Sequence, residues 1–448
     1  GGRILSEHYF AELERHLDLI CRPHGLFLDE QVTGQIWKGQ RRRVRIALYR
    51  RQPKRRKGRE ATPDSILRAL HNATSRFKSG LDSLGIEARR CTGADLYEWL
   101  LPWLTPYPGA YGGDAMRLLS ALPYPEDAFR LPYGRDLAEW LTHSMPVSDY
   151  ETRTWWFDAK PHAIVSTQAL EQRPEIGHFT RERENGARLF ALQDKLPEGS
   201  VLAITWVCKV QDEVKAHIFR LRETSKGGSI EAEATRDDCD TALRLLEGGH
   251  KCFPCQLSVF IRADQIQQLE DRRRDVETLL HQSGIKPIAA ESDLLGLESY
   301  VRHLPFNYCP ELDKKARRSR LTFSYDLAGM VPFYGRSRGT GNPGFLFFNR
   351  GGEDMTFDPL SRMDRTKNGH LLLLGPSGAG KSAMLVYLIL QAIAVHNPRV
   401  FLIEAGNSFG LLTQYLANYG LTTHQVRLDA RNRDGISLCP FLDAIRAL

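Results

Sequence analysis

The sequence lacks an apolar run long enough to cross a membrane. Its longest nearly apolar run, Ala383 to Val395, is interrupted by Gln391 and falls well short of the roughly 20 residues that a membrane helix needs. Cysteine is also sparse, with eight residues in 448 and no dense spacing pattern, which favours reduced thiols over a disulfide scaffold. The start, Gly1-Gly2-Arg3, has no charged-then-apolar leader and indicates a processed start rather than a secretion signal. With 42% apolar and 26% charged residues, the chain is predicted to be folded and cytoplasmic.

Acidic residues are missing from one stretch in particular. Between Lys38 and Arg59 the chain carries 12 Lys and Arg and no Asp or Glu, whereas the formal charge of the whole chain is only +7. Such a segment could bind nucleic acid or anionic lipid at Arg41 to Arg59. The plainer interpretation is a strand at Val44 to Tyr49, with alternate apolar residues inward, followed by a solvated loop. The composition leaves both interpretations open.

Apolar periodicity and turn residues suggest four consecutive segments. Residues 1–104 form an N-terminal α/β region that includes the basic segment 38–59, and residues 105–145 form a linker rich in Pro and Gly. Residues 146–335 alternate between strand and helix patterns, as expected of an α+β domain. Residues 336–448 follow a Gly-rich stretch and form the last segment. The elements predicted from spacing and capping are helices over residues 10–20, 62–85, 94–101, 236–246 and 263–282, and strands over residues 162–166, 201–207 and 256–261.

The last segment contains a phosphate-binding loop. Gly375, Gly380, Lys381 and Ser382 satisfy G-x-x-x-x-G-K-[ST]. An all-apolar stretch, Leu371 to Leu374, precedes the loop and reads as a buried parallel strand. A helix is expected from Ser382 to about residue 394, with a further strand at residues 399–403 and a candidate strand at residues 425–428. The order strand, loop, helix, strand is the context in which this motif binds nucleotides.

The residue types explain the chemistry expected at this loop. Glycine lets backbone N–H groups curl round phosphate oxygens, and the helix N-terminus adds partial positive charge. Lys381 is the predicted catalytic residue on the β- and γ-phosphates, and the Ser382 hydroxyl is the predicted Mg²⁺ ligand, so that ATP and Mg²⁺ are the expected cofactors. The predicted nucleotide-binding residues are Gly375, Pro376, Ser377, Gly378, Ala379, Gly380, Lys381 and Ser382.

Hydrolysis needs more than this loop, because an acid on a later strand must hold Mg²⁺ and orient water. Glu404 and Asp429 each follow a candidate strand, but neither is preceded by the four-residue apolar run that usually carries the acid. We interpret both as strand-end residues.

Several motifs together resemble the conjugative-transfer ATPases of type IV secretion systems, especially those of integrative conjugative elements. They are "FYGRSRGTGNPGFLFFNRGGEDMTFDP", "NGHLLLLGPSGAGKS", "FLIEAGNSF" and "ISLCPFLDA", with "PEIGH" and "LPEGSVLAIT" upstream, and they cover about residues 145–448. In two places the sequence departs from the pattern: Glu404 stands where the family often has Asp, and Cys439 to Phe441 stands where Asn-Pro-Phe is frequent.

The resemblance implies a TraC-like ATPase in the cytoplasm, peripheral at the bacterial inner membrane and hexameric, that works with other subunits of the secretion channel. The implied fold is an α+β N-terminal region followed by the first part of an α/β RecA-like P-loop NTPase domain. Relatives continue for several hundred residues past Leu448, through the Walker B acid and the arginine finger. We therefore expect this chain to bind ATP with weak or no hydrolysis.

The predicted function is an ATP-binding subunit that supports pilus assembly and DNA or protein transfer in the full-length protein. Two alternatives stay open. One is an ATP-binding assembly scaffold without turnover, and the other is a DNA-translocating motor of the coupling type.

Two other groups of residues have a structural and a functional interpretation. His250, Cys252 and Cys255 have zinc-ligand chemistry but lack a clear fourth ligand, so buried thiols are the favoured interpretation and no zinc is predicted. Trp155 to Phe157 could stack on single-stranded nucleic acid, although adjacent aromatic residues more often fill a core.

Overall fold

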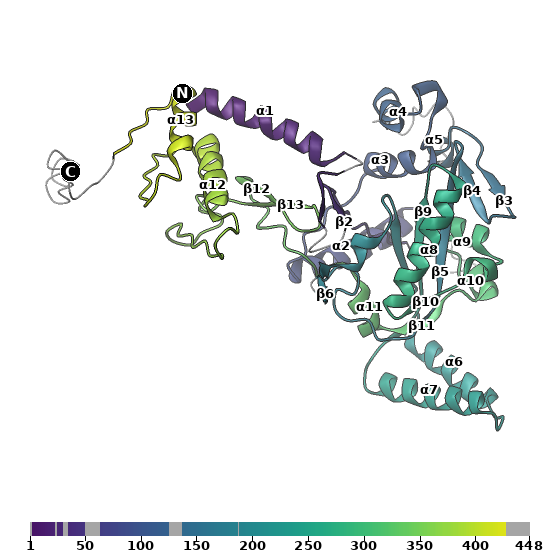
Figure 1. Cartoon of the computed structure of the whole chain (residues 1–448). Coiled ribbons are helices and arrows are strands. Elements are labelled where there is room, and N and C mark those ends of the chain that lie inside the picture. The colour runs from purple at the N-terminus through teal and green to yellow at the C-terminus, as the bar shows by residue number, and fades with distance from the viewer. Residues whose placement is uncertain are drawn as a thin grey trace. The chain divides into compact units, whose positions relative to one another are not determined.

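The computed structural model describes residues 2–22, 25–29, 35–49, 63–124, 137–186 and 188–426 (Figure 1). The chain divides into two compact units. The terminal unit comprises Gly1–Arg43, Glu184–Leu189 and Arg336–Leu448, and the central unit comprises Val44–Arg183 and Phe190–Gly335. Both units mix helices with antiparallel sheets, which confirms a mixed α/β chain. The division into four consecutive segments stays a prediction.

The central unit is built on an antiparallel sheet with helices on both faces. Its strands are β3 (Val147–Asp149), β4 (Thr154–Phe157), β5 (Lys160–Leu170), β8 (Val201–Trp206), β9 (Cys252–Arg262), β10 (Ile285–Pro287) and β11 (Arg320–Phe323). Its longer helices are α2 (Pro63–Ser83), α3 (Gly93–Leu104), α6 (Gln211–Thr224), α7 (Ile230–Glu247) and α8 (Ile266–Gln282). Its shorter helices are α4 (Ala115–Ala121), α5 (Leu137–Leu141), α9 (Gly296–Arg302), α10 (Pro310–Ala316) and α11 (Ser324–Met330).

Strands β5 and β9 form the centre of this sheet. The main order is β11-β9-β5-β4-β3, with β8 also paired to β9 and β10 to β5. Because side chains alternate along a strand, each central strand contributes to two cores. On β9, Val259 faces the cluster that α8 covers, whereas its neighbour Phe260 packs with Tyr300 of α9 and Trp103 of α3. This two-sided burial explains why β5 and β9 read as nearly continuous apolar runs.

Helices α6 and α7 form a pair that extends beyond the sheet near β11 (Figure 1). Val214 and Ile218 of α6 pack against Cys239 and Leu246 of α7, and the cluster continues to Cys252 at the start of β9. A small separate core therefore holds this pair to the sheet.

Most elements predicted for the central unit are confirmed. Pro63 and the apolar stripe identify α2, and the short helix predicted at residues 94–101 is α3. Thr92 caps α3 by accepting from the backbone N–H of Asp95, whose carboxylate accepts from the N–H of Thr92. The buried runs identify β5, β8 and β9, and the apolar stripes identify α7 and α8.

The terminal unit joins elements from both ends of the chain. They are α1 (Gly2–Ile20), the hairpin β1–β2 (Phe27–Asp29 and Gln35–Trp37), the hairpin β12–β13 (Phe345–Phe348 and Asp354–Phe357), α12 (Lys381–His396) and α13 (Gly410–Asn418). Leu5 of α1 is 1% exposed and packs with Ile393 of α12 and with Leu412 and Leu416 of α13. The predicted first helix is thus confirmed. The residue that packs on helices about 390 residues later is Leu5, whereas Phe10 of the predicted apolar stripe is 51% exposed. A further short hairpin, β6–β7 (Arg183–Asn185 and Arg188–Phe190), lies where the chain passes between the two units.

The turn of the β12–β13 hairpin receives the segment that follows β2. The backbone N–H of Gln40 donates to the Gly352 carbonyl at 2.8 Å, and its side-chain amide donates to the Gly351 carbonyl at 2.9 Å. Gly352 has a φ of +78°, and a Cβ there would lie 1.9 Å from the Lys38 carbonyl oxygen. Only glycine fits this turn without moving one of the two segments.

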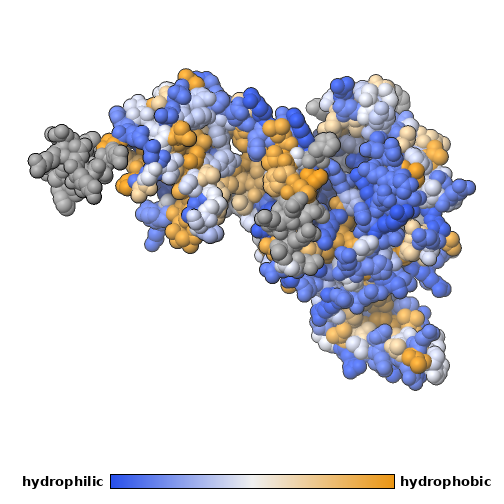
Figure 2. All heavy atoms as spheres, viewed as in Figure 1, coloured by the Kyte–Doolittle hydropathy of each residue, from blue (hydrophilic) through white to orange (hydrophobic). Residues whose placement is uncertain are grey.

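Three predicted strands are absent from the described part of the chain. Val44 to Tyr49 forms no ladder, and its alternating apolar residues are exposed, while Arg45 lies over the Trp99 ring at 4.4 Å. Leu371 to Leu374 and Arg399 to Ile403 are likewise without hydrogen-bonded neighbours, and Ile403 is 98% exposed. A strand needs a partner for its backbone groups, and apolar sequence alone does not supply one. In Figure 2, orange apolar patches are visible on the lobe that contains α12 and α13.

Several predicted features fall on residues that the structure does not describe. Part of the candidate strand 425–428, Asp429, the segment Cys439 to Phe441 and the basic residues 50–59 lie outside the described ranges. Among the helices that are described, none is both long and apolar enough to cross a bilayer.

Candidate nucleotide-binding site

The glycine loop leads directly into helix α12. Gly380 is the N-cap of α12 and Lys381 its first residue. Gly378 and Gly380 have φ values of +81° and +86°, a left-handed conformation that L-residues rarely adopt. A Cβ at either position would meet nothing within 4 Å, so the backbone conformation, rather than lack of space, favours glycine here.

Lys381 folds back over the loop that precedes it. Its Nζ donates to the carbonyl oxygens of Gly375 and Pro376, each at 2.7 Å. Residues 375–380 and Ser382 are exposed, and Ser382 lies in the first turn of the helix. An ammonium group, the open N-terminal turn of a 16-residue helix and the loop N–H groups therefore lie close together, which suits an anion such as a phosphate chain.

Helix α12 is anchored to β12 through polar side chains in its apolar surface. The buried Gln391 accepts from the backbone N–H of Leu346 at 2.7 Å, and the Tyr387 hydroxyl donates to the Leu346 carbonyl at 2.9 Å. At the end of the helix, His396 Nε2 lies 2.9 Å from a carboxylate oxygen of the buried Asp358. In the sequence, Gln391 is visible only as an interruption of an apolar run. A lone polar residue in an otherwise apolar helix is the feature that indicates such an anchor.

Glu404 has a defined partner set in the structure. Its carboxylate accepts from the backbone N–H groups of Ser408 at 2.7 Å and Phe409 at 3.1 Å, just before α13 begins at Gly410. A carboxylate at this place satisfies the open donors of the helix entry. The side chain therefore stabilises the turn into α13.

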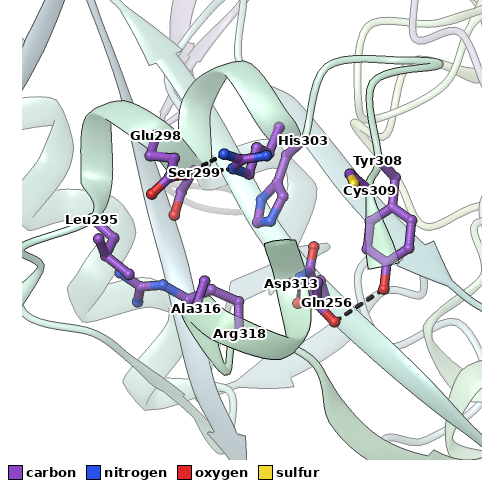
Figure 3. Close-up of a pocket in the computed structure, with 11 residues that line it drawn as sticks. Gln256, Leu295, Glu298, Ser299, His303, Tyr308, Cys309, Asp313, Ala316 and Arg318 are labelled. Carbon is purple, nitrogen blue, oxygen red and sulfur yellow. Dashed lines mark hydrogen bonds and ion pairs between the residues drawn. The ribbon is translucent and has the colours of Figure 1, made fainter. Parts of the chain in front are cut away.

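A small cavity in the central unit is the second place where polar residues converge (Figure 3). Its volume of about 10 Å³ gives room for roughly one water molecule, far too little for a nucleotide. Asp313 accepts from the Tyr308 hydroxyl at 3.0 Å and from the Ser319 hydroxyl at 2.6 Å, and also from the Gln256 amide. The cavity is lined by Gln256, Leu295, Glu298, Ser299, Arg302, His303, Tyr308, Cys309, Asp313, Ala316 and Arg318. These bonds join β9 to α10 and give the cavity a structural role.

His303, beside this cavity, is held neutral by its surroundings. Burial lowers the pKa of His303 to about 4, and its Nδ1 lies 2.8 Å from the Ser258 hydroxyl. Ser258 is 1% exposed on β9, so that no substrate can reach its hydroxyl. The serine, histidine and Asp313 of this region therefore form part of the core and do not act as a hydrolase triad.

The cysteines near the start of β9 are buried, as predicted. Burial raises the pKa of the Cys252 thiol to about 11 and that of Cys255 to about 12. The side chain of His250 packs edge-on against the Tyr325 ring, with ring centroids 5.4 Å apart. In the described ranges no group of three or more His, Cys, Asp or Glu side chains is placed to hold a metal ion.

Two of the aromatic residues at 155–157, Trp155 and Phe157, belong to the core of the central unit. Phe157 is 5% exposed and packs with Tyr300, and Trp155 Nε1 donates to the Leu297 carbonyl at 2.9 Å. The core interpretation of this sequence is confirmed for both side chains.

Comparison with known proteins identifies the family. A family model described as "TraC protein" matches residues 2–308, more than half of the chain. This match confirms the family predicted from the sequence motifs. The matched residues stop before the glycine loop, so that the family match and the loop geometry are separate observations. A search of curated proteins gives no match.

Proposed function

Because the chain belongs to the TraC family of conjugative transfer proteins, we propose that it is an ATP-binding subunit of a conjugative type IV secretion apparatus. The observation that carries this proposal is the left-handed glycine loop that delivers Lys381 to the start of α12. Loops of this sequence and conformation hold nucleotide phosphates in many unrelated proteins. ATP binding would link this chain to the energy-dependent steps of pilus assembly and of DNA or protein transfer.

In this proposal the loop residues have distinct roles. The backbone N–H groups of Gly375 and of residues 377–382 would surround the phosphate oxygens, and the helix dipole of α12 would stabilise their negative charge. Lys381 exchanges the carbonyls of Gly375 and Pro376 for the β- and γ-phosphates, and it becomes the catalytic cation of the site. The Ser382 hydroxyl would ligate Mg²⁺. Residues 336–448 then correspond to the first part of a RecA-like domain.

The same proposal includes the assembly expected of this family. The chain works with other channel subunits as a hexamer, in the cytoplasm at the inner membrane. Analytical ultracentrifugation of the full chain, with and without MgATP, tests the hexamer, which is refuted if only monomers sediment under both conditions.

Nucleotide binding is tested by titrating the full chain with a fluorescent ATP analogue in the presence of Mg²⁺. Lys381→Ala should weaken binding by at least tenfold, because a charge-assisted contact to phosphate is lost. Lys367→Ala, which removes an exposed lysine of the same unit outside the loop, is the matched control. Equal affinities for the wild type and Lys381→Ala would refute the proposed site.

A second candidate function, an ATP-binding assembly subunit without turnover, is favoured by the environment of Glu404. Each oxygen of its carboxylate accepts from one backbone N–H group, which holds the side chain to the entry of α13. A steady-state ATPase assay tests this second candidate. Turnover that depends on Lys381 would exclude the scaffold, whereas tight binding without turnover agrees with both candidates.

A further inference from the structure

A cluster of guanidinium groups surrounds the turn between β12 and β13. The guanidinium groups of Arg336 and Arg42 flank Gly351 in this turn. A Cβ placed on Gly351 would lie 2.2 Å from Nη1 of Arg336 and 3.0 Å from Nη1 of Arg42. Arg338 reaches the same place, since its Nη2 donates to the Arg42 carbonyl at 3.2 Å and pairs with Glu353. Arg42 and Arg338, from two distant segments, thus pair with the buried carboxylate of Glu353, and Arg336 flanks the same turn.

The charge of this cluster is far from balanced. The two segments that build it, residues 38–43 and 336–354, contain seven Lys and Arg but only two acids, Glu353 and Asp354. Glu353 is 4% exposed and lies 3.7 Å from Arg42, so that it is already engaged inside the cluster. The exposed side chains of Arg41, Arg43 and Arg350 add positive charge at the surface. The resulting local field attracts anions.

The β1–β2 hairpin lies beside this cluster and exposes apolar side chains. Trp37 at its end stacks on Phe27, with centroids 5.7 Å apart, and packs edge-on against Phe348 at 5.9 Å, immediately before the turn that carries the arginines. Leu28 and Ile36 are cross-strand partners and are each 53% exposed. Phe27 is 52% exposed and Leu26 47%.

A two-stranded hairpin with apolar groups exposed is only marginally stable in water, and such groups mark a contact surface. Apolar side chains next to several arginines fit the boundary between lipid headgroups and acyl chains, where the apolar groups insert and the cations meet phosphates. Nucleic acid would use the cations but would gain little from exposed Leu and Ile. The combination therefore favours a lipid surface.

We propose that the β1–β2 hairpin and the Arg41–Arg43 segment form a site that binds the surface of an anionic membrane directly. Leu28 and Ile36 enter the headgroup region, and Arg41 and Arg43 bind lipid phosphates. The site is separate from the glycine loop, and its function does not require nucleotide.

Vesicle co-sedimentation of the full chain tests this site. Vesicles of phosphatidylcholine alone are compared with vesicles that contain phosphatidylglycerol, in low and in physiological salt. Arg41→Gln/Arg43→Gln should weaken binding to the anionic vesicles by about 25-fold, since each basic residue near such a surface contributes roughly a factor of five. Leu28→Thr/Ile36→Thr keeps strand-favouring residues and should weaken binding by about tenfold or more.

The matched controls are Arg3→Gln/Arg362→Gln and Leu411→Thr, which change exposed residues of the same unit elsewhere. The proposal is supported if both site variants lose binding while the controls and the affinity for the ATP analogue stay at wild-type values. It is overturned if the chain binds neither vesicle, or if site and control variants lose binding equally. Binding of a DNA oligonucleotide that requires Arg41 and Arg43, without vesicle binding, would also overturn it in favour of a nucleic-acid surface.

Discussion

Acid should destabilise the central unit through histidines that its core holds neutral. His162 on β5 is fully buried, and its Nδ1 lies 2.9 Å from the Tyr300 hydroxyl, which in turn accepts from Trp103 Nε1 at 2.8 Å. A neutral imidazole can accept the Tyr300 hydroxyl proton at Nδ1, and protonation of the ring removes this possibility. Burial, with a smaller effect of the nearby Arg262 charge, lowers the pKa of His162 to about 3.

The sign and size of the effect follow from linkage. The pKa is about 6.5 in the unfolded chain and lower in the folded one, so that the unfolded chain takes up the proton first as pH falls. The stabilisation is complete above pH 6.5 and is lost progressively between pH 6.5 and about 3. At pH 5.0, 1.5 pH units below the unfolded pKa, the loss is about 2 kcal/mol. Burial also lowers the pKa of His178 to about 4, and this histidine should contribute a similar amount.

Urea unfolding at pH 7.5 and pH 5.0 measures this loss, with tryptophan fluorescence as the probe. Every tryptophan except Trp37 lies in the central unit, so that the signal reports mainly on this unit. The variant His162→Asn keeps a side-chain acceptor for Tyr300 but has no group that titrates at position 162. Only the wild type loses the His162 contribution at pH 5.0, so the difference in unfolding free energy between wild type and variant should be about 2 kcal/mol smaller at pH 5.0 than at pH 7.5. His16→Asn, at an exposed position of α1, is the control. An unchanged difference between the two pH values would refute the reasoning.

Three further predictions concern packing and reactivity. Gly352→Ala should lower the thermal stability of the terminal unit by the equivalent of at least about 2 kcal/mol. Gly341→Ala, at a position with a similar φ of +79° but open space around it, should cost only about 1 kcal/mol. Equal shifts of the melting temperature in the two variants would contradict the close approach of Lys38 to position 352. Leu5→Ala should cost about 2–5 kcal/mol in urea unfolding followed by circular dichroism, because it leaves a cavity between α1, α12 and α13, and a loss below 1 kcal/mol would argue against this packing. Iodoacetamide at pH 8 should modify the exposed Cys208 in the native protein well before Cys255, whose pKa is raised by burial, and mass spectrometry of timed samples would reveal the opposite order if it occurred.

The sequence was sufficient where a local signal and the final environment agree. Pro63 marks the start of α2 because the first turn of a helix does not need the backbone N–H that proline lacks. The apolar run of β9 predicts a strand because both faces of that strand are buried. The glycine loop was recognisable for a related reason, since its conformation depends on glycines within the motif itself.

The sequence was insufficient where the environment comes from distant residues. Leu371 to Leu374 has the same composition as a buried strand, yet whether it forms one depends on a neighbour that its own residues do not specify. The alternation of apolar and polar residues at Val44 to Tyr49 predicts that the apolar side chains face inward. In the structure these side chains are exposed, and Arg45 packs on the Trp99 ring instead. The guanidinium cluster and the Gln391 anchor likewise bring together positions that no spacing rule connects.

The pairing of α1 with α12 has a consequence for synthesis on the ribosome. The Ser6 hydroxyl donates to the Ala394 carbonyl at 2.8 Å across a sequence separation of 388 residues. At translation rates of about 5–20 residues per second, roughly 20–80 s elapse between the emergence of the two partners. During this interval Leu5 lacks the partners that bury it, while the central unit, which is contiguous except for residues 184–189, can already fold. The terminal unit is therefore completed after the central unit.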